Sequence, residues 1–131
     1  EHHGRAAEDC LVGAGTAGYY CAKDSQDAIK SYRPVFDARR EAFRRQGLPV
    51  VFETLEDAME RSSALIGSPQ QIIDKVLWYH EQMGHEVLAL NSDSAGLTPK
   101  EHRATLELFQ SDVAPALRRE IPSRPLVMGG V

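Results

Sequence analysis

Residues 63–121, SSALIGSPQQIIDKVLWYHEQMGHEVLALNSDSAGLTPKEHRATLELFQSDVAPALRREI, decide the fold expected for this chain. Their first half predicts a helix with a clear start and a clear stop. Ser68 can cap the helix N-terminus, Pro69 suits the first helical position, and Gly84 supplies the left-handed residue at which helices commonly end. The apolar stripe of this helix is expected to comprise Ile72, Ile73, Val76, Leu77, His80 and Met83.

A buried strand and a second helix follow. Residues 85–90 form a short, largely apolar run of strand length, and the turn-forming residues 91–94 close it. Thr98, Pro99 and Glu101 form a capping box that opens the second helix. Its apolar stripe is expected to run through His102, Leu106, Phe109, Val113 and Leu117. A strand between two helices predicts an α/β fold with a parallel sheet covered on both faces.

Three motifs in this stretch, in their order and spacing, resemble the C-terminal end of the bacterial luciferase-like, flavin-dependent monooxygenases. They are GSP at 67–69, QMG at 82–84 before the apolar strand, and LFxxxVxPxL at 108–117. YCAKDSQDA at 20–28 is similar to an earlier element of that family, so the resemblance covers most of the chain. It implies the C-terminal part of a (β/α)8 barrel, with two or three strands and a mostly helical remainder.

The resemblance also implies an activity. Members of this family, such as the related alkanal monooxygenases, oxidise an aldehyde or another small organic molecule with reduced FMN and O2, and a flavin reductase supplies the reduced flavin. A complete barrel needs about 250 residues, and the family's main flavin-phosphate and catalytic positions come from earlier strands. We therefore expect the 131 residues to be a single C-terminal fragment that carries no catalytic residue, and that neither binds FMN tightly nor turns over alone.

Four parts are expected within this fragment: a strand region, a helical insertion, a helix–strand–helix unit and a tail, at 10–24, 25–66, 67–121 and 122–131. The strand itself is expected at 18–22. The helix that follows is expected to be capped by Ser25, kinked or divided at Pro34 and stopped at Gly47. After it come an extended loop packed on the core (48–52), a short helix (54–61) and a brief connector (63–66).

A Gly-rich run offers a different function. Residues 13–18, GAGTAG, match the G-x-G-x-x-G pattern that cradles pyrophosphate when a strand precedes it and a helix follows directly. Residues 10–12 are short for that strand, Tyr19 and Tyr20 favour a strand over a helix, and Asp37, near the distance expected for a ribose-binding acid, falls in a predicted helix. We interpret the run as a flexible turn that leads into a strand. A dinucleotide-binding fragment stays open as one alternative, and a small non-enzymatic α/β interaction domain as another.

Composition narrows the class of protein. The content of hydrophobic residues, 42%, and of charged residues, 26%, is that of a soluble globular domain, and the net charge of −4 argues against a nucleic-acid binder. No apolar run approaches the roughly 20 residues that span a bilayer. Two cysteines, Cys10 and Cys21, make no disulfide framework, which favours the cytoplasm, and the five histidines show no metal-ligand spacing.

Site and partners follow from the barrel interpretation. Active sites of (β/α)8 enzymes lie at the C-terminal ends of the strands. Those ends are expected at Lys23 and Asp24 and at Asn91, Ser92 and Asp93, which are the candidate residues at the mouth of a site. Two or three parallel strands alone would leave sheet edges unpaired. We therefore expect a homodimer or a higher homo-oligomer.

Overall fold

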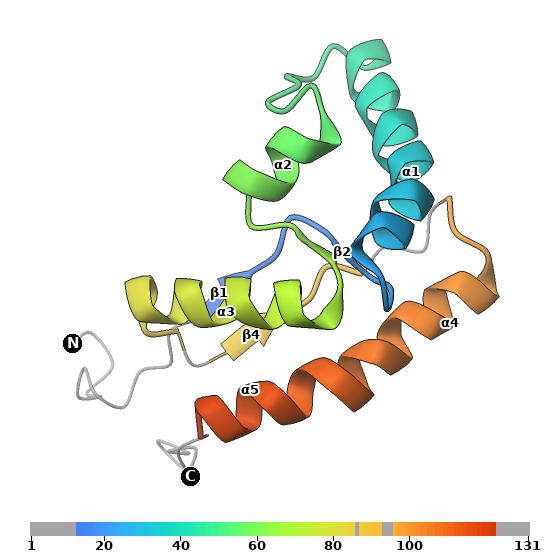
Figure 1. The fold of residues 1–131 in the computed structure, drawn as a ribbon. Coiled ribbons are helices and arrows are strands. Elements are labelled where there is room, and N and C mark those ends of the chain that lie inside the picture. The colour runs from blue at the N-terminus through green and yellow to red at the C-terminus, as the bar shows by residue number, and fades with distance from the viewer. Residues whose placement is uncertain (1–12, 86, 93–95, 123–131) are drawn as a thin grey trace, which may run out of the picture.

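The computed structural model describes residues 13–85, 87–92 and 96–122 (Figure 1). The strand candidate at 10–12, Asp93 and most of the predicted tail lie outside these ranges. The elements are, in chain order, β1 (Gly13–Gly15), β2 (Tyr19–Cys21), α1 (Ser25–Arg45), α2 (Leu55–Arg61), β3 (Leu65–Gly67), α3 (Pro69–Met83), β4 (Val87–Ala89), α4 (Pro99–Leu108), a π-helical segment (Phe109–Val113) and α5 (Ala114–Glu120). No helix in the described ranges combines the length and apolar character that crossing a membrane requires.

The strands form two parallel pairs. β1 pairs with β4, with Gly13 opposite Val87, and β2 pairs with β3, with Tyr19 opposite Leu65. β1 and β2 are consecutive pieces of one extended stretch, so a single segment of chain holds both later strands. The predicted parallel pairing is confirmed. β4 therefore lies beside the first part of this stretch and β3 beside its second part.

Two of these strands lie where the sequence predicted none. Residues 13–18 were expected to form a flexible turn, yet Gly13–Gly15 is β1. Residues 63–66 were expected to be a connector, yet Leu65–Gly67 is β3. A strand of three residues is too short to show an alternating pattern, and pairing with a distant segment decides its conformation.

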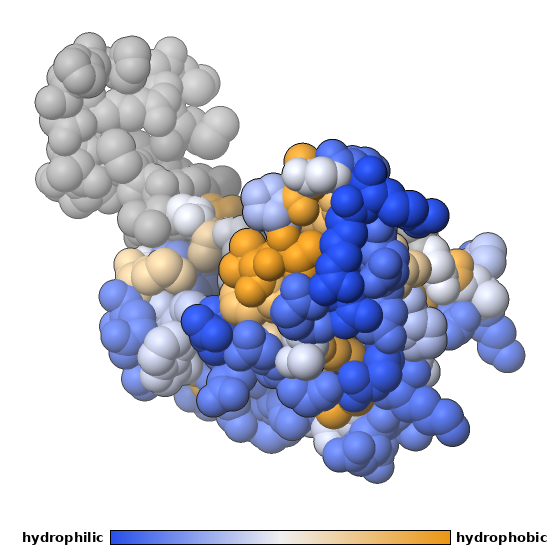
Figure 2. All heavy atoms as spheres, turned by 90° about the horizontal axis from the view of Figure 1, so that it is seen from above, coloured by the Kyte–Doolittle hydropathy of each residue, from blue (hydrophilic) through white to orange (hydrophobic). Residues whose placement is uncertain are grey.

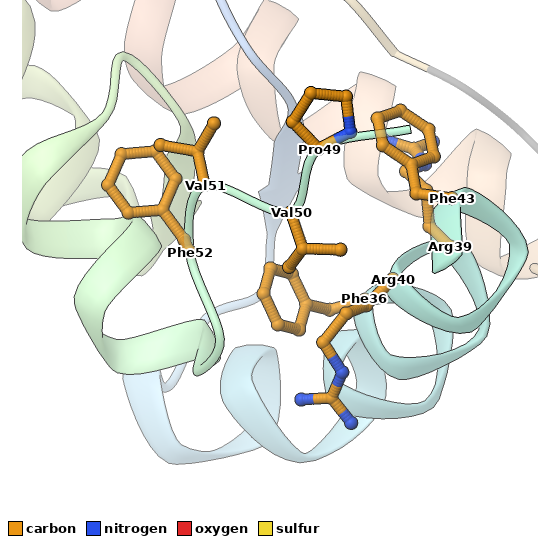
Figure 3. A pocket seen from close by; sticks show the side chains of 8 residues that line it. All are labelled: Phe36, Arg39, Arg40, Phe43, Pro49, Val50, Val51 and Phe52. Atoms are coloured by element: carbon orange, nitrogen blue, oxygen red, sulfur yellow. The ribbon is translucent and has the colours of Figure 1, made fainter. Parts of the chain in front are cut away.

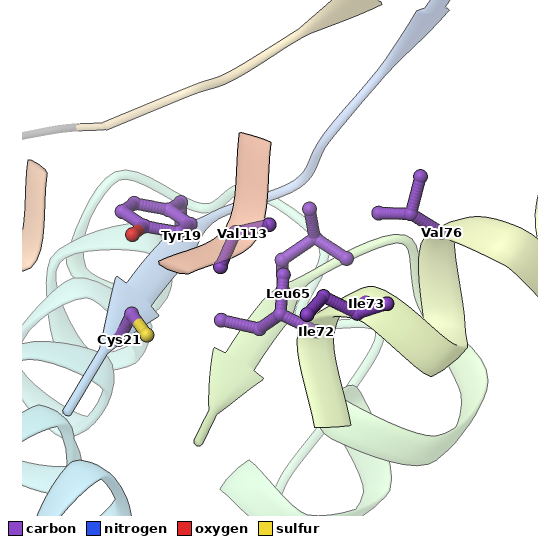
Figure 4. Packing of buried hydrophobic residues seen from close by; sticks show 7 residues of the cluster. All are labelled: Tyr19, Cys21, Leu65, Ile72, Ile73, Val76 and Val113. Carbon is purple, nitrogen blue, oxygen red and sulfur yellow. The ribbon is translucent and has the colours of Figure 1, made fainter. Parts of the chain in front are cut away.

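Every residue of β2 and β3 is buried, and successive side chains of a strand point to opposite faces. The β2–β3 pair is therefore covered on both faces. The first core, on one face, comprises Tyr19, Cys21, Leu65, Ile72, Ile73, Val76 and Val113 (Figure 4). The second core, on the other face, comprises Tyr20, Ala28, Tyr32, Val35, Leu55, Ala64 and Ile66. α3 and the π-helical segment thus cover one face of the pair, and α1 and α2 cover the other.

α1 is one continuous helix of 21 residues. Its cap is Asp24 and not the predicted Ser25, because Asp24 Oδ1 accepts a hydrogen bond of 2.7 Å from the amide of Gln26. Of the two effects predicted for Pro34, a kink or a division, the division does not occur, because Pro34 lies inside the continuous helix. Gly47, with φ of +72°, follows the end of the helix, as predicted.

The loop after α1 does not pack on the core, contrary to the prediction for residues 48–52. Leu48 and Val51 are 45% and 77% exposed. Arg40 donates a hydrogen bond of 2.5 Å to the carbonyl oxygen of Glu53, and Arg44 forms an ion pair with the Glu53 carboxylate. These contacts fasten the end of the loop to the side of α1 and so hold it away from the core.

α3 begins and ends as predicted. Ser68 Oγ accepts a hydrogen bond from the Gln71 amide, and Gln71 Oε1 accepts one from the Ser68 amide at 3.0 Å, which completes a capping box. Gly84 has a φ of +62°, and its amide donates to the carbonyl oxygen of His80 at 2.7 Å. The stop is therefore a left-handed glycine cap.

Gly84→Ala is expected to lower the free energy of unfolding by about 1–2 kcal/mol, because a Cβ at positive φ crowds the following carbonyl oxygen. No heavy atom from elsewhere in the fold lies within 4 Å of the added Cβ, so the cost comes from the backbone alone. Urea denaturation followed by circular dichroism measures the effect. Gly13→Ala is the control, because that Cβ also meets nothing and the φ is not positive. An equal loss in both variants would contradict the assignment.

The second predicted helix contains a wider turn. Its capping box is confirmed, since the Glu101 amide donates to Thr98 Oγ1 at 3.1 Å. Within the π-helical segment the amide of Ala114 donates to the carbonyl oxygen of Phe109, five residues earlier. Pro115 has no N–H, and its ring clashes with a carbonyl group in a regular α-helix. The π-helical turn just before Pro115 accommodates the ring while the helix continues.

The predicted apolar stripes are only partly correct. On α3, Ile72 and Val76 are buried whereas Met83 is exposed. On α4, Leu106 is exposed and its neighbour Thr105 is buried instead. The rotation of α4 follows from hydrogen bonds that Thr105 makes to β2, which periodicity of apolar residues does not reveal.

Candidate functional site

The residues predicted to line a site follow β2 and β4. Lys23 and Asp24 come after β2 and are exposed, and Asp24 is occupied as the cap of α1. Asn91 and Ser92 come after β4. Asn91 is exposed, and Ser92 Oγ is buried without a hydrogen-bond partner among the described residues. Asp93 lies outside the described residues.

A pair of hydrogen bonds locates the end of β4. The Asn91 amide donates to Thr16 Oγ1 at 2.8 Å, and the Thr16 amide donates to the carbonyl oxygen of Ala89 at 3.1 Å. Thr16 lies between β1 and β2, seven residues before Lys23. Among the described residues no hydrogen bond or ion pair joins the residues after β4 to those after β2. The structure therefore brings Asn91 to Thr16, and the grouping of all five candidates stays a prediction.

Thr16 is the residue at this strand end that sequence reasoning missed. A signal was present, because Thr16 carries the only polar side chain in the run GAGTAG. The structure of the same run does not have the geometry that dinucleotide binding requires. The strand Tyr19–Cys21 follows Gly18 where a helix N-terminus would have to begin.

FMN does not fit the described strand ends. A phosphate is commonly held by the free N–H groups at a helix N-terminus. The Asp24 carboxylate already caps α1 and would repel a phosphate. At α3 the capping box is closed, and the Gln71 side chain fills the space beside Gly67, where an added Cβ would lie 2.3 Å from Gln71 Oε1. At α4 a capping box of Thr98 and Glu101 is closed in the same way, so none of the three helix starts that follow a described strand is open to the phosphate of a flavin.

Four clefts lie elsewhere on the described surface. A cleft of about 500 Å³ runs along α4 from Leu97 to Gln110, and one of about 300 Å³ lies between β4 and α5. A third, of about 250 Å³, separates α1 from residues 49–52 (Figure 3), and a small, partly open pocket of about 40 Å³ lies between β1 and α3. The side where α1 and α2 end the molecule shows a hydrophobic patch bordered by hydrophilic residues (Figure 2). None of the four is lined by a described residue that the sequence proposed for the site, although Thr16 lines the smallest. A metal centre is likewise not found: no cluster of three potential ligands occurs within the described part of the chain.

His85 is a buried histidine two residues before β4, only 5% exposed. Its ring meets that of His80 edge-on, with centroids 5.4 Å apart, and His80 Nδ1 lies 2.8 Å from the carbonyl oxygen of His85. His85 Nδ1 has no hydrogen-bond partner within the described residues. Burial, and secondly the neighbouring His80, lower the pKa of His85 below its ordinary value. The interpretation of His80 as a core histidine with a satisfied ring nitrogen agrees with this geometry.

The free energy of unfolding is expected to fall as the pH drops below about 6.5, the ordinary pKa of histidine. Because the folded-state pKa of His85 is lowered, the unfolded chain takes up the proton first, so acid favours unfolding from that pH down to the folded-state pKa. Urea denaturation at about pH 5 and about pH 7.5 measures the change. His85→Phe should reduce the pH dependence. The same dependence in wild type and variant would show that His85 is not its source.

Cys21 is structural and not a nucleophile. Burial raises the pKa of its thiol to about 11, so the thiol stays protonated at neutral pH. The Cys21 amide donates to Thr105 Oγ1 at 2.6 Å, and the Tyr19 hydroxyl donates to the carbonyl oxygen of Thr105, also at 2.6 Å. These buried bonds tie β2 to α4.

Comparison with known proteins rests on structure. No protein-family model matches the sequence, and no curated protein matches it. Among solved structures, the monooxygenase RslO1 from Streptomyces bottropensis matches 79% of this chain and 30% of its own, with a TM-score of 0.60 and 20% identity. Another is a type II Baeyer–Villiger monooxygenase, the oxygenating constituent of 3,6-diketocamphane monooxygenase from the CAM plasmid of Pseudomonas putida, in complex with FMN. It matches 79% of this chain and 32% of its own, with a TM-score of 0.57 and 19% identity.

The chain has the fold of part of a luciferase-like monooxygenase barrel. The resemblance that the sequence motifs predicted is thereby confirmed, and so is the α/β class. The match spans less than a third of the length of either monooxygenase. The match shows the fold of this chain. Its activity, substrate and cofactor are proposed below.

Proposed function

We propose that this chain is part of a flavin-dependent monooxygenase that oxidises an aldehyde or a similar small organic molecule with reduced FMN and O2. The single observation that carries the proposal is the shared fold: parallel strands and their covering helices superpose on monooxygenases over 79% of the chain, although identity is only 19–20%. The sequence motifs that resemble the same family support it independently.

The described residues have a supporting part in this proposal. β2 and β3 are covered on both faces, so they form a rigid piece of the barrel wall and not a mobile loop. FMN supplies the redox chemistry in such enzymes. Since the strand ends described here do not fit its phosphate, the flavin site is formed mainly by residues other than these. The 131 residues alone are expected neither to bind FMN tightly nor to turn over.

Flavin titration tests the proposal. The 131-residue chain and the product of the longest reading frame that contains it are each titrated with FMN, followed by flavin fluorescence. O2 consumption is then measured with a reductase-supplied reduced flavin and decanal. We expect saturable FMN binding and aldehyde-dependent O2 consumption from the longer product only. Tight stoichiometric binding to the 131-residue chain would overturn the supporting role, and inactivity of both with a panel of aldehydes and ketones would overturn the activity.

We also propose two kinds of partner, further copies of the chain and a flavin reductase. Trp78, Met83 and Val87 are 55%, 51% and 43% exposed, and an added Cβ at Gly13 or Gly15 would meet nothing within 4 Å. These exposed apolar side chains support association into a homodimer or a higher homo-oligomer. A flavin reductase is the enzyme expected to supply reduced flavin to the complete barrel. No nucleic-acid or membrane partner is proposed. Sedimentation velocity gives the assembly state, and a monomer at all concentrations would exclude the homo-oligomer.

The alternative is a small α/β interaction domain without enzymatic activity. One observation favours it: the described residues form two cores around β2 and β3, which gives the chain packing of its own. A stable folded monomer, expressed at this length from its own start codon and inactive in the flavin assays, would select this alternative.

A further inference from the structure

The two pairs of strands are not equally buried. Every residue of β2 and β3 is buried, whereas the first and last residues of β1 and of β4 are exposed. Among the described residues, neither core takes a buried member from β1 or β4, and Leu88 and Leu90 pack against the first core only partly buried. A segment with little buried surface opens at a lower cost in free energy than the whole fold. The β1–β4 pair is therefore the part of the sheet that can open by itself.

His85 lies at the junction that such an opening would break. Its side chain lines both the cleft between β4 and α5 and the small pocket between β1 and α3, and Val76 and Leu88 line both spaces with it. The ring is thus packed where α3, α5 and β4 meet, with β4 between the two helices (Figure 1). Because one residue separates His85 from β4, movement of β4 away from β1 carries this ring into water.

The groups around the ring do not balance a positive charge on it. α3 contributes His80, whose ring centroid is 5.4 Å from that of His85, and Tyr79. α5 contributes Arg118, and the π-helical segment contributes Phe109. The described residues of β1 and β4 have no titratable side chain, and no carboxylate is among the described residues that line either space. A proton on His85 would therefore be buried near an arginine and a second histidine, without a counter-charge from this part of the chain.

Hydrogen bonding acts in the same direction. In an imidazolium both ring nitrogens are donors, and His85 Nδ1 has no acceptor among the described residues. Burial, and secondly His80, lower the pKa of His85 in the closed structure, whereas in water the pKa returns to about 6.5. The open form therefore takes up the proton first. The closed form loses stability as the pH falls from about 6.5 to the lowered pKa.

We propose that protonation of His85 opens the β1–β4 pair locally in mild acid, while β2, β3 and the helices that cover them stay folded. The fall in the free energy of unfolding that is expected in acid then begins at this pair of strands. Opening also separates Asn91 from Thr16, because the bond between them lies at the end of β4. It thereby takes apart the strand end that carries candidate site residues. The switch is independent of the proposed monooxygenase activity, because it requires neither flavin nor substrate.

Amide hydrogen exchange, measured by NMR on the isotope-labelled chain, tests the proposal. The Thr16 amide reports on the β1–β4 pair, because it donates to the carbonyl oxygen of Ala89 at 3.1 Å. The Ala22 amide reports on the β2–β3 pair, because it donates to the carbonyl oxygen of Gly67 at 3.2 Å. Protection factors are compared at about pH 7.5 and about pH 5, each corrected for the intrinsic exchange rate at that pH.

We expect the protection of Thr16 to fall by about 3- to 30-fold between the two pH values. The upper limit follows from linkage, since the opening constant of one titrating group rises at most about 10-fold per pH unit below about 6.5. The protection of Ala22 should change by less than about 2-fold, because the β2–β3 pair opens only with the whole fold.

Three variants assign the effect to one side chain. His85→Phe keeps a ring in the junction and cannot titrate, so Thr16 should stay protected at both pH values. His85→Gln gives a second non-titrating side chain, and far-UV circular dichroism at about pH 7.5 confirms that each variant is folded. His102→Gln is the matched control, because His102 lies on α4 in a different cleft, and its pH response should equal that of wild type.

Four results would overturn the proposal. The first is unchanged protection of Thr16 in wild type. The second is an equal fall at Thr16 and Ala22, which would show unfolding of the whole chain. The third is a wild-type response in both His85 variants, which would assign the titration to another group such as His80. The fourth is loss of the response in Glu86→Gln, which would assign it to a carboxylate.

Discussion

Leu65→Ala is expected to lower the free energy of unfolding by about 2–5 kcal/mol. Leu65 is 1% exposed at the first position of β3, and its side chain lies in the first core with Tyr19 and Ile72. Truncation removes buried methyl groups and leaves a cavity. Because helices cover both faces of β3, the surrounding side chains are held in place and cannot fill it. Urea denaturation followed by far-UV circular dichroism measures the loss.

Leu48→Ala is the matched control for this prediction. The substitution is the same, but Leu48 is 45% exposed in the loop after α1, so the expected loss is below about 1 kcal/mol. Similar small losses in both variants would contradict the buried position of β3. The sequence-based interpretation of residues 63–66 as a connector would then be the better one.

The helices could be predicted from sequence because their signals are local. Ser68 and Thr98 each satisfy the first amides of their own helix, and the residue three positions into each helix returns the bond. Gly84 stops α3 through its own backbone conformation. The one shifted cap, from Ser25 to Asp24, is a choice between two adjacent capping residues of similar preference.

The strands could be predicted only where an apolar run was long enough. All four strands have three residues, but only β2 and β4 lie in apolar runs of four residues, so β1 and β3 were missed. The partners of β1 and β3 lie 46 or more residues away along the chain. Gly13 and Gly15 also carry no side chain that would show strand propensity. Parallel pairing depends on such distant contacts, and no local pattern contains them.

The candidate site illustrates the same limit. The sequence identified the residues that follow β2 and β4. Because active sites of (β/α)8 barrels lie at the C-terminal ends of the strands, these residues were predicted to line one site. The order of strands decides whether they meet, and in this structure β4 ends beside Thr16 in the middle of the Gly-rich run. Asp24, offered as a site residue, is bound to the start of α1. Side-chain type alone did not distinguish a cap from a ligand contact.

Thr105→Val is expected to lower the free energy of unfolding by about 1–3 kcal/mol. Thr105 is 1% exposed, and its Oγ1 accepts a hydrogen bond of 2.6 Å from the Cys21 amide, 84 residues away in sequence. Valine has nearly the same shape, so no cavity forms, but the Cys21 N–H is left buried without an acceptor. The bond from the Tyr19 hydroxyl goes to the backbone of residue 105 and is retained.

Thr16→Val provides the comparison, because it removes the same type of bond in an exposed position. The Asn91 amide that donates to Thr16 Oγ1 at 2.8 Å can bond to water instead, so the expected loss is below about 0.5 kcal/mol. Hydrogen exchange of the Cys21 amide should accelerate in Thr105→Val and stay unchanged in Thr16→Val. Unchanged exchange in both would show that the Thr105 hydroxyl does not hold β2 to α4. The burial of Thr105 in place of Leu106 would then lose its physical explanation, because this bond is what orients α4 against the sheet.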